Sequence, residues 1–208
     1  TLVTGDTNNK NDIFLYDHVN TTTARTSVSS AGVQGNHDSV SPNISSDGRY
    51  IVFESQASNL VLGDTNGDRD IFVYDRDLDT LERVSVSSLG VEANDWSYYG
   101  SISSDGRYVT FQSDATNLVA GDTNGVTDVF VYDRTLDTIE RISLGDMGAE
   151  SDGVSDTSRI SGDGLFVSFY SQATNLVASD TNGVADIFVR NLTLDTTERV
   201  SISTLGVE

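Results

Sequence analysis

The sequence repeats itself at a constant step of 58 residues, and this repeat constrains the fold more than any other feature. Four segments come into register at this step: DTNNKNDIFLYD from Asp6, DTNGDRDIFVYD from Asp64, DTNGVTDVFVYD from Asp122 and DTNGVADIFVRN from Asp180. A second block keeps the same step: NISSDGRYIVFES from Asn43, SISSDGRYVTFQS from Ser101 and RISGDGLFVSFYS from Arg159. Near-identity at one unvarying spacing predicts an architecture of stacked or radial units.

Each repeat is predicted to hold four short strands. The segment that includes Ile-Ser is the first strand, and Asp-Gly at 47–48, 105–106 and 163–164 provides a tight hairpin turn to the second. A longer loop leads to the third strand, DIFVYDR, and a turn through Leu-Asp-Thr leads to the fourth, ERVSVSS. These segments are rich in Ile, Val, Phe, Tyr and Thr, which favour half-buried pleated sheets.

A unit of four antiparallel strands is too small to bury both of its faces, so it must pack against its copies. A parallel solenoid would need shorter coils without hairpin turns, and a sandwich has no reason to repeat at one period. We therefore predict an all-β fold of β-propeller blades, about three and a half in number, with units at 1–34 (a half blade), 35–92, 93–150 and 151–208. The half blade suggests either a piece of a longer array or completion by other copies.

The segments SSDGRYIVFES, DIFVYD and ERVSVS together resemble the TolB-like β-propeller repeat, a relative of the WD-type blade. The resemblance covers essentially the whole chain. It implies four-stranded blades around a central channel and, because many members are extracytoplasmic bacterial proteins, an extracellular or periplasmic location. The chain departs from the usual repeat by lengthening the middle loop with SNLVxGDTNG. Since propellers host unrelated activities, the resemblance implies the fold more strongly than a function.

Charge narrows the range of partners. The chain has 32 acidic residues against 12 Lys and Arg, a formal net charge of −20. Without a basic surface, neither nucleic acid nor an anionic membrane is an expected partner, and cations are the natural counterpart. No apolar run approaches the roughly 20 residues of a membrane span, so membrane insertion is not expected.

The middle loop carries the residues with the most potential chemistry, because Asp, Asn and Asp recur at positions 1, 3 and 7 of DxNGxxD. Calcium takes six to eight oxygen ligands, and alternate positions of a tight loop can provide them. We therefore predict Ca²⁺ as cofactor, with these ligands in the four units: Asp6, Asn8, Asp12, Asp64, Asn66, Asp70, Asp122, Asn124, Asp128, Asp180, Asn182 and Asp186.

The alternative to calcium is a metal-free turn, since Asp, Asn and Gly are ordinary turn residues. Asn9 replaces the loop glycine of the other units, although Asp6, Asn8 and Asp12 remain. This substitution favours ligation over turn geometry. A separate candidate is the arginine after the Asp-Gly turn, Arg49 or Arg107, which could anchor an anion. We interpret it instead as a surface ion pair beside a hairpin, because the third unit has Leu165 there.

The connections between units differ most from one another: VQGNHDSVSP, VEANDWSYYG and AESDGVSDTS. Variable loops on a rigid repeat are common places for recognition. The candidate partner-binding residues are His37, Trp96, Tyr98 and Tyr99, whose rings could stack on a sugar or on a partner's side chain. The alternative is that these rings only fill the gap between blades.

Catalysis is not expected. Only His18 and His37 are histidines, neither recurs in another unit, and there is no cysteine, so an arrangement of the usual nucleophile and base has little to draw on. The leading hypothesis is a secreted, calcium-binding, non-catalytic binding module for a protein or glycan partner. A second hypothesis is a structural repeat protein that assembles into oligomers or filaments, with calcium stiffening each unit. A third is a glycan hydrolase, although its paired acids would repeat in every unit whereas an active site is normally single.

Overall fold

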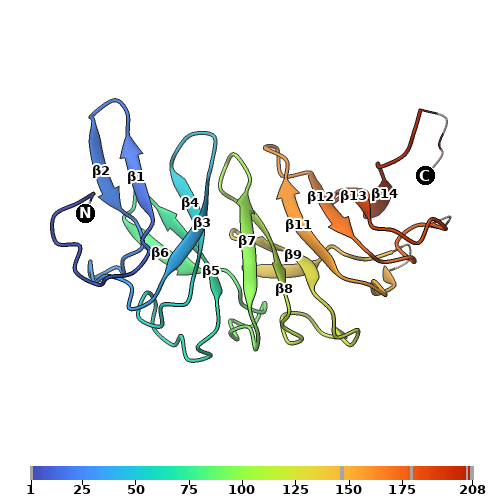
Figure 1. The fold of residues 1–208 in the computed structure, drawn as a ribbon, viewed down its shortest axis with the longest axis horizontal. Coiled ribbons are helices and arrows are strands. Elements are labelled where there is room, and N and C mark those ends of the chain that lie inside the picture. The colour runs from blue at the N-terminus through green and yellow to red at the C-terminus, as the bar shows by residue number, and fades with distance from the viewer. Residues whose placement is uncertain (1, 146–147, 179, 205, 207–208) are drawn as a thin grey trace.

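The computed structural model describes residues 2–145, 148–178, 180–204 and 206. A two-stranded hairpin, β1 (Phe14–Asp17) and β2 (Thr22–Arg25), is followed by three four-stranded antiparallel sheets. The sheets lie side by side along an arc that runs from the N-terminus to the C-terminus (Figure 1). The all-β prediction is confirmed.

Each sheet is one blade, and its strands follow each other in chain order. Blade 1 consists of β3 (Ser39–Ile44), β4 (Tyr50–Ser55), β5 (Asp70–Asp75) and β6 (Thr80–Arg83). Blade 2 consists of β7 (Ser97–Ile102), β8 (Tyr108–Ser113), β9 (Asp128–Asp133) and β10 (Thr138–Arg141). Blade 3 consists of β11 (Ser155–Ile160), β12 (Phe166–Ser171), β13 (Asp186–Asn191) and β14 (Thr196–Arg199). The first strand β7 contacts both β3 and β11, as the inner strands of neighbouring radial blades do.

The Asp-Gly pairs form the predicted turns between first and second strands. Gly48, Gly106 and Gly164 have φ angles of 73°, 72° and 71°, a conformation that glycine adopts without steric cost. In blade 1 the Asp47 carboxylate accepts hydrogen bonds from the Ser45 hydroxyl and the Arg49 backbone N–H. The turn is therefore closed by the aspartate as well as permitted by the glycine.

A β-bulge in β7 and another in β11 each join the strand to the blade before it. The bulge in β7 lies between Tyr98 and Ser101, and Tyr99 within it has a φ of 52°. The Tyr99 backbone N–H donates to the Glu54 carboxylate of blade 1 at 2.7 Å. Thr157 of blade 3 donates in the same way to Gln112 of blade 2, also at 2.7 Å. The bulge re-aims one N–H across the gap between blades.

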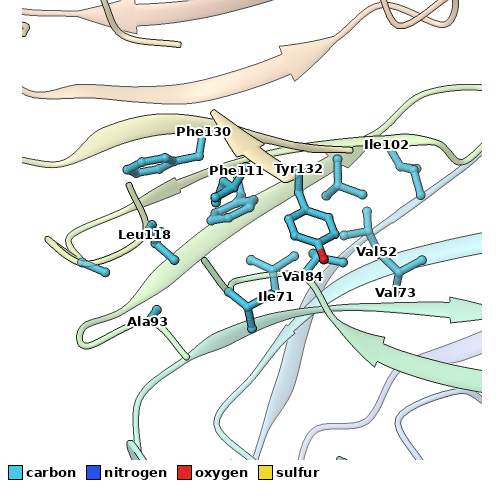
Figure 2. Packing of buried hydrophobic residues seen from close by; sticks show 14 residues of the cluster. Val52, Ile71, Val73, Val84, Ala93, Ile102, Phe111, Leu118, Phe130 and Tyr132 are labelled. Atoms are coloured by element: carbon cyan, nitrogen blue, oxygen red, sulfur yellow. The ribbon is translucent and has the colours of Figure 1, made fainter. Parts of the chain in front are cut away.

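Between the blades lie continuous apolar layers. Figure 2 shows the layer between blades 1 and 2, where Ile71 and Val73 pack with Phe111 and Phe130. Each blade also carries a cross-strand stacked phenylalanine pair, with ring centroids 5.8, 6.0 and 5.7 Å apart in blades 1, 2 and 3. Burial of one such side chain stabilises the fold by about 1.5–3 kcal/mol. A blade alone would lose most of this burial, which explains why the unit repeats.

Antiparallel strands give each blade two different ends. We call the end with the short hairpin turns, such as 45–49 and 76–79 in blade 1, the turn end. The opposite end holds the long middle loops and the connections between units, such as 56–69 and 84–96, and we call it the loop end. In Figure 1 the first hairpin turns of the blades lie along the upper edge and the long loops along the lower edge.

Candidate functional site

An arginine from the fourth strand enters each DxNGxxD loop. In blade 1 the Nη1 atom of Arg83 lies 3.3 Å from Asp64, 3.2 Å from Asp70 and 3.0 Å from Glu92. The side chains of Arg83, Asp64 and Asp70 are 8%, 3% and 0% exposed. The guanidinium therefore fills the space between the two aspartates in which the sequence predicts calcium.

The same cluster recurs in the other units, which we call together the arginine clusters. Its members are Arg25 with Asp6, Asp12 and Gln34; Arg141 with Asp122, Asp128 and Glu150; and Arg199 with Asp180 and Asp186. Glu208, the counterpart of Glu150 in sequence, lies outside the described residues. The DxNGxxD motif does not include these arginines, although an arginine is present at this position in all four units.

The loop asparagine is held as a hydrogen-bond donor to the aspartate. In blade 1 the Nδ2 atom of Asn66 donates to Asp70 at 3.3 Å and to the carbonyl of Ala93 at 3.0 Å, while its Oδ1 accepts from the Asp68 backbone N–H. A carbonyl only accepts and an N–H only donates, so these partners fix the amide orientation. The oxygen that would bind calcium faces the turn. Asn8 and Asn124 make the equivalent contacts, and Asn182 donates to Asp186.

The first unit retains the turn geometry without its glycine. Asn9 has a φ of 62°, close to the 74° of Gly67 and the 67° of Gly125. Because asparagine tolerates this left-handed conformation, the loss of glycine at Asn9 does not by itself favour ligation over a turn.

The loops as they stand do not fit a calcium ion between their aspartates, since the arginine lies there. Within the described part of the chain, no group of three or more His, Cys, Asp or Glu side chains is arranged to hold a metal ion. Calcium binding stays a prediction, and it requires the arginine to leave.

One guanidinium does not fully compensate the buried carboxylates. Burial raises the pKa of Asp64 to about 6, and the neighbouring Asp70 adds to this, while Arg83 acts in the opposite direction. Asp122 has its pKa raised to about 6 for the same reasons. By contrast, hydrogen bonds from the side chain and backbone of Thr123 lower the pKa of Glu150 to about 2. The clusters of blades 1 and 2 thus each combine a glutamate whose pKa is lowered with an aspartate whose pKa is raised.

At the turn end of blades 1 and 2, the arginine after the Asp-Gly turn forms the predicted ion pair. Arg49 lies 2.7 Å from Asp75, and Arg107 lies 2.6 Å from Asp133. Each guanidinium also stacks on the adjacent tyrosine ring, at 4.8 Å for Tyr50 and 4.6 Å for Tyr108. The interpretation as a hairpin with an ion pair is confirmed.

Three of the four predicted partner-binding residues come together at the start of β7. The Trp96 and Tyr98 rings are 6.0 Å apart, and the Tyr98 and Tyr99 rings 6.4 Å. Tyr99 is 50% exposed, and the other two rings are half-buried. We call these rings, with the adjacent Asp95 and Asp114, the Trp96 patch. His37 lies one unit earlier, before β3, where its Nδ1 accepts a hydrogen bond from the Asp38 N–H.

An ion pair supports the patch from blade 1, and it was not foreseen from the sequence. The Arg69 guanidinium lies 5.2 Å from the Trp96 ring centre, and its Nη1 donates to Glu54 at 3.0 Å. Glu54 is fully buried and also accepts the Tyr99 N–H. The residues equivalent to Arg69 in the other units are Asn11, Thr127 and Ala185, so this arrangement occurs once in the chain.

Four-stranded blades that adjoin through their first strands define the class of this fold, the β-propeller. The fold is that of TolB-like propellers. The structure is similar to TolB from Acinetobacter baumannii, with a TM-score of 0.53 and 17% identity over 94% of this chain and 39% of that one. It is also similar to a putative TolB from Agrobacterium tumefaciens, with a TM-score of 0.53 and 18% identity over 88% of this chain and 52% of that one.

A third similar structure is the tricorn protease, with a TM-score of 0.50 and 17% identity over 86% of this chain and 16% of that one. The chain thus spans about two fifths to one half of the length of the two TolB structures. No protein-family model matches the sequence, and no curated protein matches it. At these identities the similarity establishes the fold and leaves the activity to be inferred from the site.

Among the described residues there is no helix that is long and apolar enough to cross a membrane.

Proposed function

We propose that this chain is a non-catalytic binding module whose Trp96 patch binds a protein or glycan partner. One observation carries the proposal: the patch is built once, on a scaffold that otherwise repeats. The equivalents of Trp96 are Asp38 and Val154, and those of Tyr99 are Ser41 and Thr157. The fold therefore does not need these rings, and aromatic rings on a rigid support are common anchors of recognition.

The test uses residues that the chain itself tolerates at these positions. The triple variant Trp96→Val, Tyr98→Val, Tyr99→Ser takes its side chains from Val154, Val40 and Ser41, and Ser41 shares the left-handed backbone of Tyr99 with a φ of 54°. Wild type and variant are compared on a glycan array and on a panel of purified secreted proteins. We expect at least one partner to bind wild type and to lose affinity at least tenfold for the variant.

The control is Tyr16→Ser, which removes a 56% exposed tyrosine from β1. If the partners bind wild type, the triple variant and the control with equal affinity, the Trp96 patch is not the binding site. Turnover of a bound glycan by wild type would refute the non-catalytic part.

The location belongs to the same proposal. An extracellular or periplasmic protein is implied by the resemblance to TolB-like repeats, and fractionation of the source cells tests it. Recovery in the cytoplasmic fraction would contradict it. Calcium enters only as a stabiliser of loops from which the arginine has moved away. The repeated aspartates support it, and melting curves with Ca²⁺ and with EDTA test it.

A second candidate, association with another blade, is favoured by one surface of blade 3. Ile187, Val200 and Ile202 are 41%, 47% and 46% exposed. Their equivalents in blade 1, Ile71, Val84 and Val86, are buried against blade 2. Light scattering of wild type and Ile202→Asp, with and without chelator, measures the mass. Oligomers that the substitution dissociates would support assembly, and a wild-type monomer in both conditions would exclude it.

A further inference from the structure

The charges around the Trp96 patch narrow the kind of partner it fits. Asp95 is exposed, and Asp114 accepts hydrogen bonds from the hydroxyls of Tyr98 and Thr127. Burial, then the hydrogen bond to Asp114, raises the pKa of Tyr98, so this hydroxyl remains a proton donor. The two aspartates give the patch a negative charge beside exposed ring surface.

The cation beside the patch is already engaged. Arg69 is paired with Glu54 at 3.0 Å, so these two charges offset each other and leave Asp95 and Asp114 uncompensated by them. The formal charge of the whole chain, −20, adds a long-range attraction for cations.

The chain shows how a guanidinium fits such a surface. Arg69 lies over Trp96 while it donates to a carboxylate, and Arg49 lies over Tyr50 while it pairs with Asp75. Ring faces attract cations, and a carboxylate that reaches the same cation adds its own Coulomb attraction. The exposed Tyr99 ring and the two aspartates offer the same pair of contacts to a cation from outside.

We infer that the partner of the Trp96 patch is a basic peptide segment, whose Lys or Arg side chains lie on the aromatic rings and pair with Asp95 and Asp114. This inference rests on the proposed function and names its ligand class. A neutral glycan would use the rings but would gain little from the two charges. Charge complementarity of this kind sets on-rate and specificity, so binding should weaken as salt rises.

The probe is the fluorescein-labelled peptide GRGKGRGKG, compared with peptides in which Gln or Glu replaces every Arg and Lys. Fluorescence anisotropy is measured with the full chain at low and at physiological salt. We expect the basic peptide to bind, the Gln peptide to bind at least tenfold more weakly, and the Glu peptide not to bind. The triple variant Trp96→Val, Tyr98→Val, Tyr99→Ser should lose at least tenfold in affinity.

A matched pair of charge variants separates the patch from the general acidity of the chain. Asp95→Asn with Asp114→Asn should weaken binding several-fold and reduce its salt dependence. Asp137→Asn, which removes an exposed carboxylate at the turn end of blade 2, should change affinity less than twofold. Melting curves confirm that each variant is folded.

The outcomes distinguish the inference from the proposed function. No binding of the basic peptide, or equal binding by wild type and both patch variants, overturns the inference. If an oligosaccharide or the Gln peptide instead binds wild type and is lost in the triple variant, the inference is wrong and the binding module stands. If the basic peptide fails and no partner in the array experiment depends on the patch, both are wrong.

Discussion

In blades 1 and 2 both ends pair an arginine with an aspartate, but the pKa of the aspartate is lowered at the turn end and raised at the loop end. At the turn end of blade 1, the hydrogen bond from Arg49 lowers the pKa of Asp75. At the loop end, Asp64 lies 3.3 Å from Arg83 and yet has its pKa raised to about 6. Arg49 is 34% exposed and Arg83 only 8%. Proximity to an arginine therefore does not decide how a carboxylate ionises, because burial can outweigh it.

The number of carboxylates per arginine explains the rest of the difference. Asp75 has Arg49 close to it and also accepts the N–H groups of Asp77 and Leu78. Asp64 shares Arg83 with Asp70 and Glu92, so repulsion adds to the cost of burial. The loop end thus stores unfavourable electrostatic energy that the turn end does not.

The largest expected effect comes from removing the buried arginine. Arg83→Met leaves Asp64, Asp70 and Glu92 without their cation, and loss of one partner from a buried ion pair costs about 3–5 kcal/mol. Arg49→Met removes the solvated pair and should cost much less. Urea unfolding of both variants measures the difference in their free energies of unfolding. Equal losses of stability would contradict a difference between the two ends.

The two ends of blade 2 also differ in how much space surrounds a glycine. A Cβ on Gly106 would lie 2.1 Å from the Tyr50 ring of the preceding blade, whereas one on Gly125 at the loop end would meet nothing within 4 Å. Both glycines have positive φ, so Ala at either position costs about 1–2 kcal/mol in backbone strain. Gly106→Ala should lose about 1–3 kcal/mol more than Gly125→Ala because of overpacking. Similar unfolding midpoints would mean that Tyr50 moves freely.

Melting experiments with calcium test whether Arg83 occupies a position that a metal ion could otherwise fill. Arg83→Met brings three carboxylates together without a cation, so millimolar Ca²⁺ should raise its melting midpoint by several degrees more than that of wild type. Binding to the native state stabilises in proportion to the logarithm of ligand concentration, about 2.7 kcal/mol at one hundred times Kd. EDTA serves as the reference condition. If wild type responds as strongly, calcium binds with the arginine in place; if neither responds, the loop prediction is wrong.

The smallest expected effect is on pH dependence. Since the pKa values of Asp64 and Asp122 are raised to about 6, the folded state binds more protons than the unfolded state between about pH 4 and 6. Wild type should therefore gain stability relative to Asp64→Asn with Asp122→Asn as the pH falls from 7 to 5, on the order of 1 kcal/mol per group. Midpoints recorded at several pH values measure this, with Asp137→Asn as control. Parallel profiles would contradict the raised pKa values.

Much of the fold could be predicted because its determinants are local and recur. The Asp-Gly turns and the order of the strands are determined within one unit, and the constant step repeats them along the chain. The structure confirms the turns and the four-stranded units. The bulge at Tyr99 could not be predicted, since its left-handed backbone is stabilised by Glu54 of another blade, 45 residues away. Residues that act across blades have no nearby signal in the sequence.

The part of the candidate site that is formed by residues close in sequence could be predicted, and the part contributed by another blade could not. Trp96, Tyr98 and Tyr99 are neighbours in sequence, so their clustering follows from one strand. Arg69 and Glu54 come from blade 1, and nothing in their local sequence links them to those rings. The sequence does show an arginine at the same position in all four units. That this arginine reaches the acidic loop could not be predicted, because its side-chain position depends on how the fourth strand pairs with the third.

The sequence by itself determined that this chain is an array of similar β-sheet units, because a repeated hydrophobic pattern that one unit cannot bury requires neighbours. It also determined that acidic loops stand at one end of every blade. Only the tertiary structure decided what lies between the aspartates, since Arg83 reaches Asp70 from the paired strand 13 residues later and Glu92 closes the cluster from the next connection. The negative charge of the loops predicted a cation between the aspartates. The cation is an arginine side chain, because strand pairing places this long basic side chain in a buried acidic loop.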